Sequence, residues 1–202
     1  MNKFPDQIVF ATHNRGKLVE LQRILGNLPT EWLTLNDLDI SQDVIENGGS
    51  FAENAAIKAV EYAKITGVWT LADDSGLTVD ALDGRPGIYS ARYGGGHDVP
   101  FPDKWTTLLD ELKSTPWTRR TAQFRCVLVL SSPDGNEIRQ AEGICPGRIA
   151  FAPRGSGGFG YDPLFYLDDF GCTLAELGDS EKDKISHRGL AARALLREID
   201  LH

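Results

Sequence analysis

Short apolar runs and segments with helical spacing alternate along the first third of the chain. Gln7 to Thr12 is mostly apolar, which predicts a buried strand. Lys17 to Leu25 carries leucines three or four residues apart, which predicts a helix with one apolar face. Ser50 to about Ile65 predicts a second helix, because it opens with a capping-box pattern and keeps alanines on one side. Trp69 to Ala72 then predicts a short strand.

A different pattern follows in the second half. Ala122 to Leu130 and Glu137 to Ile144 are strand-like and flank Ser132-Pro-Asp-Gly-Asn136, whose turn residues predict a β-hairpin. Ser186 to Ile199 predicts a closing helix. Strand–helix units followed by a hairpin predict an α/β fold with a mixed sheet. Because neither a repeat nor a linker interrupts the sequence, we expect residues 1–202 to form a single domain.

Composition narrows the class of protein. The net charge is −8, from 21 Lys and Arg against 29 Asp and Glu, whereas proteins that bind nucleic acid normally present a basic surface. Three cysteines without CxxC spacing support neither a disulfide framework nor a zinc ribbon. The apolar run near the start is too short for a signal peptide, and no stretch approaches the ~18 apolar residues of a membrane span. We therefore expect a cytoplasmic protein with no nucleic-acid or membrane partner.

The first candidate site lies where the first strand passes into the first helix. Free backbone N–H groups at a helix start, together with a glycine and a lysine, suit a phosphate group. The residues concerned are Thr12, His13, Asn14, Arg15, Gly16 and Lys17. The simpler interpretation is that Asn14 only caps the helix and that Lys17 is a solvated surface residue.

Acidic residues form the second candidate site. Asp73 and Asp74 are adjacent at the expected end of a strand, where burying two carboxylates is costly without a cation. A divalent ion such as Mg²⁺ would relieve that cost and accept phosphate oxygens. Glu53 is a third acid, although its place in the capping box needs no catalytic role. A surface turn is the simpler interpretation of the acidic pair, and a surface pair that of Asn54 with Lys58.

A glycine-rich loop and the start of the last helix form the third candidate site. Three glycines surround Phe159, which could lie against a purine, while Asp162 could accept a hydrogen bond from the base edge. A turn with Phe159 in the core is the alternative. His187 and Arg188 fall in the first turn of the last helix, where cations oppose the helix dipole, so a bound anion would compensate them. Together, the three sites predict a binding site for a nucleoside triphosphate.

Six runs, taken in order, resemble the inosine triphosphate pyrophosphatase family. They are Ala11-Thr-x-Asn14-x-x-Lys17-x-x-Glu20, Ser50-Phe-x-Glu-Asn-Ala-x-x-Lys58, Ala72-Asp-Asp-Ser-Gly-Leu77, Gly84-x-Pro-Gly-x-Tyr-Ser-Ala-Arg92, Gly157-Gly-Phe-Gly-Tyr-Asp-Pro163 and Ser186-His-Arg188. The resemblance implies an elongated α/β fold with a mixed central sheet, two lobes flanking a nucleotide-binding cleft, and a homodimer. It also implies Mg²⁺-dependent hydrolysis of non-standard purine nucleoside triphosphates (ITP, dITP and XTP) to the monophosphate and pyrophosphate.

The same resemblance implies roles for single residues. Asp74 is implied as proton acceptor and metal ligand, with Glu53 and Asp73 beside the metal. Phosphate binding is implied for Thr12, Asn14, Lys17 and Ser75. The residues implied around the base and the phosphates are Arg92, Phe159, Gly160, Tyr161, Asp162, Lys182, His187 and Arg188.

Two segments depart from the family pattern. Ile45-Glu46-Asn47-Gly48 stands where many relatives have Glu-Glu-Thr-Gly, which leaves Glu46 without an assigned role. The segment Gly94 to Pro102 is also unusual, and it follows the fourth run directly. A change there would alter a mobile loop beside the cleft that the resemblance implies.

The expected mechanism is in-line attack of a metal-oriented water on a phosphorus atom of the triphosphate. Asp74 would act as the general base, and Lys17 and Lys182 would neutralise the developing charge. Hydrogen-bond donors in the site would pair with the 6-oxo group of inosine or xanthine and reject the amino group of adenine. The alternatives are a pyrophosphatase for pyrimidine or other modified nucleotides, a γ-phosphatase, and a nucleotide sensor without turnover.

Overall fold

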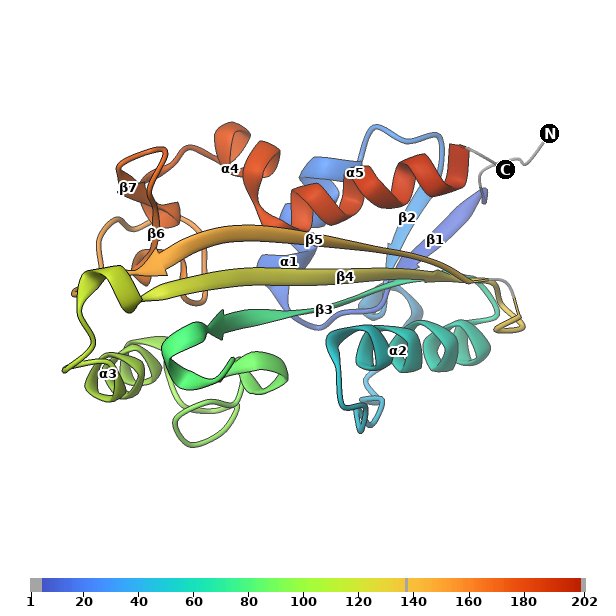
Figure 1. The fold of residues 1–202 in the computed structure, drawn as a ribbon. Coiled ribbons are helices and arrows are strands. Elements are labelled where there is room, and N and C mark those ends of the chain that lie inside the picture. Colours follow the sequence, from blue (N-terminus) through green and yellow to red (C-terminus); the bar gives the residue numbers. More distant parts are fainter. Residues whose placement is uncertain (1–4, 137, 201–202) are drawn as a thin grey trace. The chain divides into compact units, whose positions relative to one another are not determined.

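The computed structural model describes residues 5–136 and 138–200 (Figure 1). Within them, seven strands form one sheet in the order β2-β1-β3-β4-β5-β6-β7. β1 is parallel to β2 and β3, whereas β6 is antiparallel to β5 and β7, so the predicted α/β fold with a mixed sheet is confirmed. The strands are β1 (Gln7–Phe10), β2 (Glu31–Thr34), β3 (Trp69–Val79), β4 (Thr121–Ser131), β5 (Ile138–Ile149), β6 (Phe165–Leu167) and β7 (Cys172–Thr173). The helices are α1 (Arg15–Leu25), α2 (Phe51–Thr66), α3 (Phe101–Glu111), α4 (Asp179–Ile185) and α5 (His187–Asp200).

The described chain divides into two compact units. Unit 1 consists of the described parts of residues 1–74, 126–143 and 187–202, and unit 2 of residues 75–125 and 144–186. The division falls within strands, because β3, β4 and β5 each contribute residues to both units. Each unit has an apolar core of its own, so each buries enough surface to define its local structure.

Unit 1 packs helices on both sides of its strands. Figure 1 shows α5 on one side of these strands and α2 on the other, and α1 packs against α5. The core combines Ile8 of β1, Leu21 of α1, Leu128 of β4 and Leu195 of α5, all buried. The leucines of α1 that predicted an apolar face therefore do form one, and they hold the start of α1 against the sheet.

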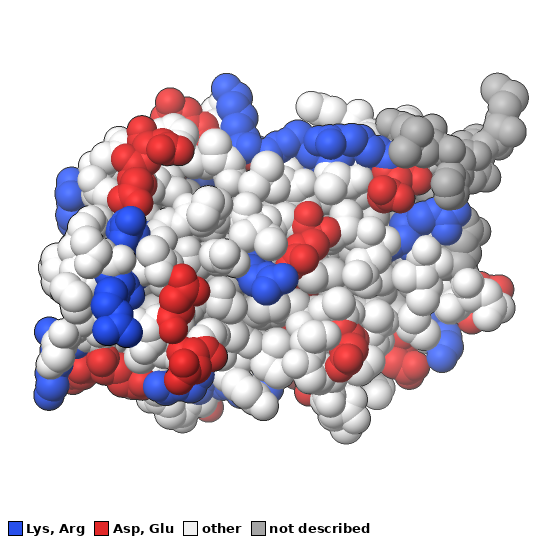
Figure 2. All heavy atoms as spheres, in the orientation of Figure 1, with Lys and Arg blue, Asp and Glu red and all other residues white. Residues whose placement is uncertain are grey.

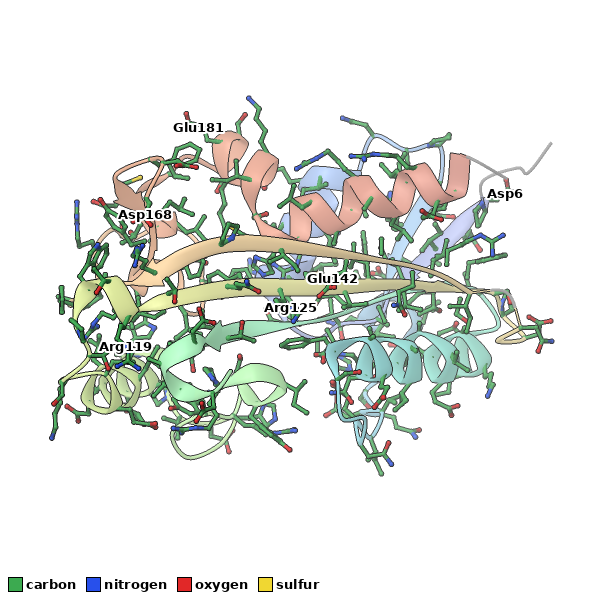
Figure 3. The ribbon with its side chains drawn as sticks, viewed as in Figure 1. Asp6, Arg119, Arg125, Glu142, Asp168 and Glu181 are labelled. Carbon is green, nitrogen blue, oxygen red and sulfur yellow. The ribbon has the colours of Figure 1, made fainter. Side chains whose placement is uncertain are left out.

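Unit 2 buries the other ends of the long strands. Leu77 of β3, Phe124 of β4 and Phe165 of β6 belong to its core, and the rings of Phe124 and Phe165 lie 4.4 Å apart. Outside the core, Arg148 Nε donates a hydrogen bond to Asp168 at 2.8 Å, which ties β5 to the turn after β6. Figure 3 labels Asp168 beside β6 and β7. The ends of β5 and β6 are therefore fixed by a polar contact as well as by packing.

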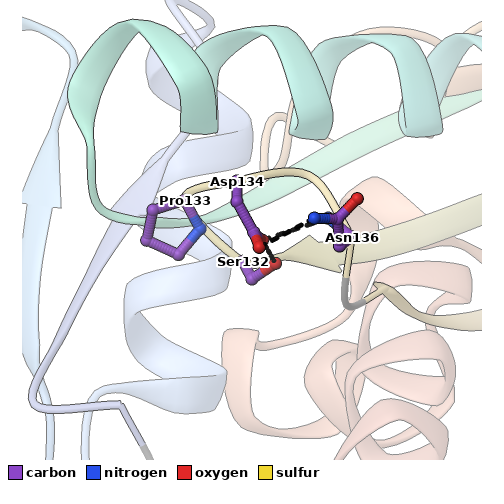
Figure 4. Close-up of a pocket in the computed structure, with 4 residues that line it drawn as sticks. All are labelled: Ser132, Pro133, Asp134 and Asn136. Carbon is purple, nitrogen blue, oxygen red and sulfur yellow. Dashed lines mark hydrogen bonds between the residues drawn. The ribbon is translucent and has the colours of Figure 1, made fainter.

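The hairpin predicted between β4 and β5 is confirmed. Asp134 organises its turn, since Oδ1 accepts from the hydroxyl of Ser132 and from the N–H of Asn136, and Gly135 adopts a φ of 75°. Figure 4 shows these side chains lining a pocket at the turn. Glu137, expected at the start of the second strand, lies outside the described residues.

One prediction about the strands is wrong. β3 does not end at Ala72 but runs to Val79, so Asp73 and Asp74 lie inside a strand rather than in a surface turn. Both are buried, with 2% and 8% of their surface exposed. Each carboxylate has a cationic partner in unit 1, which reduces the expected cost of burying it.

Charge on the surface is mixed. On the face drawn in Figure 2, acidic and basic side chains are interspersed over most of the surface, and basic side chains follow one another along the upper edge, over α5. None of the helices in the described residues is long and apolar enough to cross a membrane.

Candidate functional site

Residues 12–17 form the junction between β1 and α1. Thr12 Oγ1 accepts a hydrogen bond from the N–H of Asn14 at 3.1 Å, and Asn14 Oδ1 caps α1 by accepting from the N–H of Lys17 at 3.2 Å. His13 is exposed, with Nε2 3.7 Å from Asp43 Oδ1. The junction that the sequence predicted is therefore present, and Asn14 does serve as the helix cap.

Asp73 is the centre of a buried ionic network in unit 1. Its Oδ1 forms an ion pair with the ammonium of Lys17, and its Oδ2 accepts from Arg188 Nε at 3.0 Å and from Cys126 Sγ at 3.1 Å. Arg188 also donates through Nη1 to Glu20. Burial alone would raise the pKa of Asp73, but Arg188 and Lys17 hold it well below the usual range for an aspartate.

This network bears on two expectations. Arg188, in the first turn of α5, has anionic partners within the protein, since Asp73 and Glu20 both contact its guanidinium. The carboxylate of Asp73 contacts two cations and a thiol, and its role beside a metal stays a prediction. Lys17 is correspondingly held in place and is not a freely solvated residue.

Asp74 faces a different set of partners. Lys58 Nζ lies 3.4 Å from Asp74 Oδ1 and 3.1 Å from Glu46 Oε2, so one ammonium joins two carboxylates. The second oxygen, Asp74 Oδ2, is buried and has no hydrogen-bond partner among the described residues. Burial raises the pKa of Asp74, and the charges of Glu46 and Asp73 add to this, while Lys58 opposes it.

Glu53 caps the start of α2 but with a different partner from the one predicted. Ser50 Oγ accepts from the N–H of Glu53, whereas the Glu53 carboxylate accepts from the N–H of Gly49 at 2.6 Å instead of from Ser50. Across residues 5–136 and 138–200 no three His, Cys, Asp or Glu are placed to hold a metal ion. The structure therefore does not gather Glu53, Asp73 and Asp74 into the single metal group that the sequence suggested.

The glycine-rich loop of unit 2 is organised by Asp162. Its Oδ2 accepts from the N–H of Phe159 and from Lys182 Nζ, both at 2.8 Å. The ammonium of Lys182 also lies 5.2 Å from the centre of the half-buried Phe159 ring. Gly158 has a φ of 69°, and a Cβ there would lie 2.1 Å from Asp162 Oδ2. Asp162 thus holds its own loop, and its contact with a base edge stays a prediction.

One further loop of unit 2 carries a predicted residue, Arg92. Tyr161 is buried and donates its hydroxyl to the carbonyl of Ser90 at 3.1 Å, which joins the glycine-rich loop to the segment before Arg92. The guanidinium of Arg92 lies 4.8 Å from the centre of the Tyr89 ring. These contacts place Arg92 on a loop that is tied to the glycine-rich loop.

The predicted residues fall into two sets, one in each unit. Unit 1 holds Thr12, His13, Asn14, Arg15, Gly16, Lys17, Glu53, Asp73, Asp74, His187 and Arg188. Unit 2 holds Ser75, Arg92, Phe159, Gly160, Tyr161, Asp162 and Lys182. The chain passes from the first set to the second at the peptide bond between Asp74 and Ser75, and back to the first between Ser186 and His187.

Four residues that contact the predicted ones were given no site role from the sequence. They are Glu20, Glu46, Lys58 and Cys126. Lys58 could have been found, because its helical spacing from Asn54 puts both on one face, and that face is buried rather than exposed. The pairing of Glu20 with Arg188 joins residues 168 positions apart, for which the sequence carries no local signal.

Comparisons with known proteins place this arrangement in context. The model of the Ham1 family matches residues 8–198. The chain is 51% identical over 193 residues to a dITP/XTP pyrophosphatase of Nostoc sp., covering 95% of this chain and 93% of that protein. It is 49% identical over 192 residues to a dITP/XTP pyrophosphatase of Geobacter sulfurreducens, covering 95% of each. A solved HAM1 protein from Coxiella burnetii has a TM-score of 0.87 and 38% identity, over 97% of this chain and 99% of that one.

Proposed function

The chain belongs to the Ham1 family, and we propose that it hydrolyses non-standard purine nucleoside triphosphates (ITP, dITP and XTP) to the monophosphate and pyrophosphate. The names of the relatives support this substrate class, and the likeness extends over nearly the whole of each chain. The six motifs that predicted such a family fall within the matched residues 8–198. The proposal therefore rests on the full chain rather than on one motif.

The observation that carries the proposal is that Asp74 is buried while one of its carboxylate oxygens has no hydrogen-bond partner among the described residues. A general base near neutral pH works best when its pKa is raised toward the working pH. Burial raises the pKa of Asp74, and its Oδ2 has no hydrogen-bond partner in the described part of the chain. The carboxylate of Asp74 would take the proton of an attacking water.

A divalent cation fits the same oxygen. A buried carboxylate oxygen without a donor is stabilised by a metal ion, and Mg²⁺ prefers carboxylate oxygens and keeps several waters. We propose that Asp74 and Glu53 hold Mg²⁺ and that Asp73 does not, because cations already occupy Asp73. The ion would supply charge neutralisation to the phosphates.

The remaining predicted residues of unit 1 are proposed to bind phosphate. The start of α1 offers backbone N–H groups between Thr12 and Lys17, and anions are favoured at such a helix end. Asp73 fixes the ammonium of Lys17, so the cation is oriented before the substrate binds. In unit 2, Lys182 is fixed in the same way by Asp162. Phosphoryl transfer depends mainly on such positioning and charge neutralisation.

Recognition of the base is proposed for unit 2. The half-buried ring of Phe159 suits a flat purine, and Arg92 with the N–H groups of the glycine-rich loop would donate to its 6-oxo group. Adenine carries an amino donor at that position, which would leave donors facing one another. This predicts a preference for 6-oxo purines over ATP.

Pyrophosphate release from ITP, dITP, XTP, GTP and ATP, with Mg²⁺ and with EDTA, tests the proposal. We expect release from ITP, dITP and XTP that depends on Mg²⁺, and little from ATP. Equal kcat/KM values for ATP and ITP would contradict the proposed recognition of the 6-oxo group. Preferred turnover of pyrimidine triphosphates would favour the related pyrophosphatase, and binding without turnover would favour a sensor.

We further propose, from the family resemblance, that the protein is a cytoplasmic homodimer. Sedimentation equilibrium of the full chain tests the assembly: a mass of twice 22.2 kDa supports it, and a mass of 22.2 kDa contradicts it.

A further inference from the structure

Helix α3 contacts both loops of unit 2 that carry predicted base-binding residues. Trp105 Nε1 donates to the carbonyl of Gly160 at 2.9 Å, and the Phe101 ring packs edge-on against Tyr161 at 5.3 Å. These two contacts hold the end of the glycine-rich loop. The other loop, residues 85–96, is held by polar groups on the same helix.

Lys104 is the first of these groups. It is 1% exposed, and its ammonium donates to the carbonyl of Ala91, the residue before Arg92. The ammonium also lies 5.0 Å from the centre of the Phe101 ring. A buried ammonium is costly unless it is hydrogen-bonded, and Lys104 donates its hydrogen bond to the loop. Burial lowers the pKa of Lys104.

Glu111, at the last turn of α3, is the second group. One carboxylate oxygen lies 2.7 Å from Arg85 Nη2, and the other accepts from the hydroxyl of Tyr93 at 2.5 Å. Arg85 and Tyr93 stand at the two ends of the segment that contains Arg92. A single carboxylate therefore ties both ends of residues 85–93 to α3, while Lys104 holds the segment at Ala91.

The glycines after Tyr93 bring the chain back onto α3. Gly94 has a φ of 72°, and a Cβ there would lie 3.0 Å from Thr107 Oγ1. This is the start of the Gly94 to Pro102 segment, which departs from the family pattern and leads directly into α3. The unusual segment is thus the connection that lets α3 fold back against residues 85–93.

We propose that Lys104 and Glu111 are positioning residues, which clamp residues 85–93 to α3 and so set the affinity for the base through Arg92. The inference rests on the proposed function only for its last step, in which Arg92 contacts the base. Because the clamp touches neither the phosphates nor the acids, it should affect binding of the nucleotide and not the hydrolytic step. The expected signature is a rise in KM at constant kcat.

The experiment compares Lys104→Met with Lys113→Met. Methionine keeps the length of the side chain but removes the donor to Ala91, whereas Lys113 is an exposed lysine just beyond α3. We expect Lys104→Met to raise KM for ITP about tenfold with kcat within about twofold, as loss of uniform binding does. Hydrogen exchange should quicken in residues 85–93 and remain unchanged in β1. Lys113→Met should leave KM, kcat and exchange as in the wild type.

Glu111→Gln provides a second, milder variant if Lys104→Met does not fold. It removes the negative charge that holds Arg85. As in Lys104→Met, KM for ITP should rise and hydrogen exchange in residues 85–93 should quicken. Unchanged exchange in residues 85–93 overturns the clamp, and a fall in kcat with constant KM overturns its restriction to binding. If the wild type releases no pyrophosphate from ITP, the proposed function fails, but the exchange measurement still decides whether α3 clamps the segment.

Discussion

Asp73 and Asp74 are consecutive residues of β3, yet their carboxylates belong to separate networks. Successive side chains of a strand point to opposite faces, and here Asp73 meets Lys17 and Arg188 while Asp74 meets Lys58. The pKa of Asp73 is held well below the usual range and that of Asp74 is raised. One acid is therefore a fixed counter-ion, and its neighbour is suited to accept a proton.

Substitution of Asp74 by Asn should abolish most activity without unfolding the protein. General-base catalysis typically contributes at least about 100-fold, so turnover of ITP should fall by that factor or more. Because the pKa of Asp74 is raised by folding, its ionised form destabilises the folded protein at neutral pH, and Asn should leave the melting temperature equal or higher. The turnover of ITP and the melting temperature, both measured at pH 7, check these two expectations. Near-normal turnover would remove Asp74 from this role.

Asp73→Asn should act mainly on stability. Removing one partner of a buried ion pair leaves the other uncompensated and costs about 3–5 kcal/mol. Arg188 is 1% exposed and would keep Glu20 but lose Asp73. Urea unfolding at pH 7 measures the loss. A variant as stable as the wild type, but inactive, would instead indicate that Asp73 is a metal ligand.

The contribution of Asp73 should depend on pH in a defined direction. Its pKa in the folded protein is lower than in the unfolded chain, where it is near 3.8. The stabilisation is therefore present above the unfolded pKa and is lost as the pH falls through the folded pKa. The stability difference between wild type and Asp73→Asn should be largest near neutral pH and shrink below about pH 4. A difference that does not change with pH would contradict the ionic network.

Lys58 should set the acid limb of the pH–activity profile. Its positive charge lowers the pKa of Asp74, against the raising effect of burial. Lys58→Met should therefore move the acid limb of kcat/KM to higher pH, which a profile from pH 4 to 9 would detect. Lys64→Met, on the exposed side of α2, is the matched control and should not move the limb. If the acid limb of Lys58→Met lies at the same pH as in the wild type, Lys58 does not influence the pKa of Asp74.

Gly158→Ala should weaken nucleotide binding through the glycine-rich loop. The backbone is left-handed there, which costs a non-glycine residue about 1–2 kcal/mol, and KM should rise about tenfold. Gly178→Ala is the control, because a Cβ at Gly178 meets nothing within 4 Å. Equal KM values for the two variants would show that Phe159 and Asp162 do not depend on the shape of this loop.

Elements with local signals were predictable from the sequence. The caps Asn14 and Ser50 mark the starts of α1 and α2, and the turn around Asp134 and Gly135 marks the hairpin. Each of these signals involves neighbours within a few residues. The strand–helix order and the two helices could therefore be assigned before any tertiary contact was known.

The network of Asp73 could not be predicted, because its partners are distant in sequence. Arg188 lies 115 residues away, and nothing near Asp73 indicates that a cation will meet it. Two adjacent acids without a known cationic partner favour a surface turn or a metal site. The predicted end of β3 at Ala72 is therefore seven residues too early. The short strands β2, β6 and β7 carry too little periodicity to have been assigned. Helix α3 was missed although Phe101, Trp105 and Leu108 recur at helical spacing.

The products formed from ITP test the central claim most directly. ³¹P spectra of ITP with Mg²⁺ and the wild-type protein should show the monophosphate and pyrophosphate appearing together in equal amounts. Asp74→Asn under the same conditions should leave ITP unchanged over the same period, whereas Asp73→Asn should still form pyrophosphate wherever it remains folded. Appearance of inosine diphosphate with orthophosphate, or pyrophosphate release by Asp74→Asn at the wild-type rate, would contradict the account.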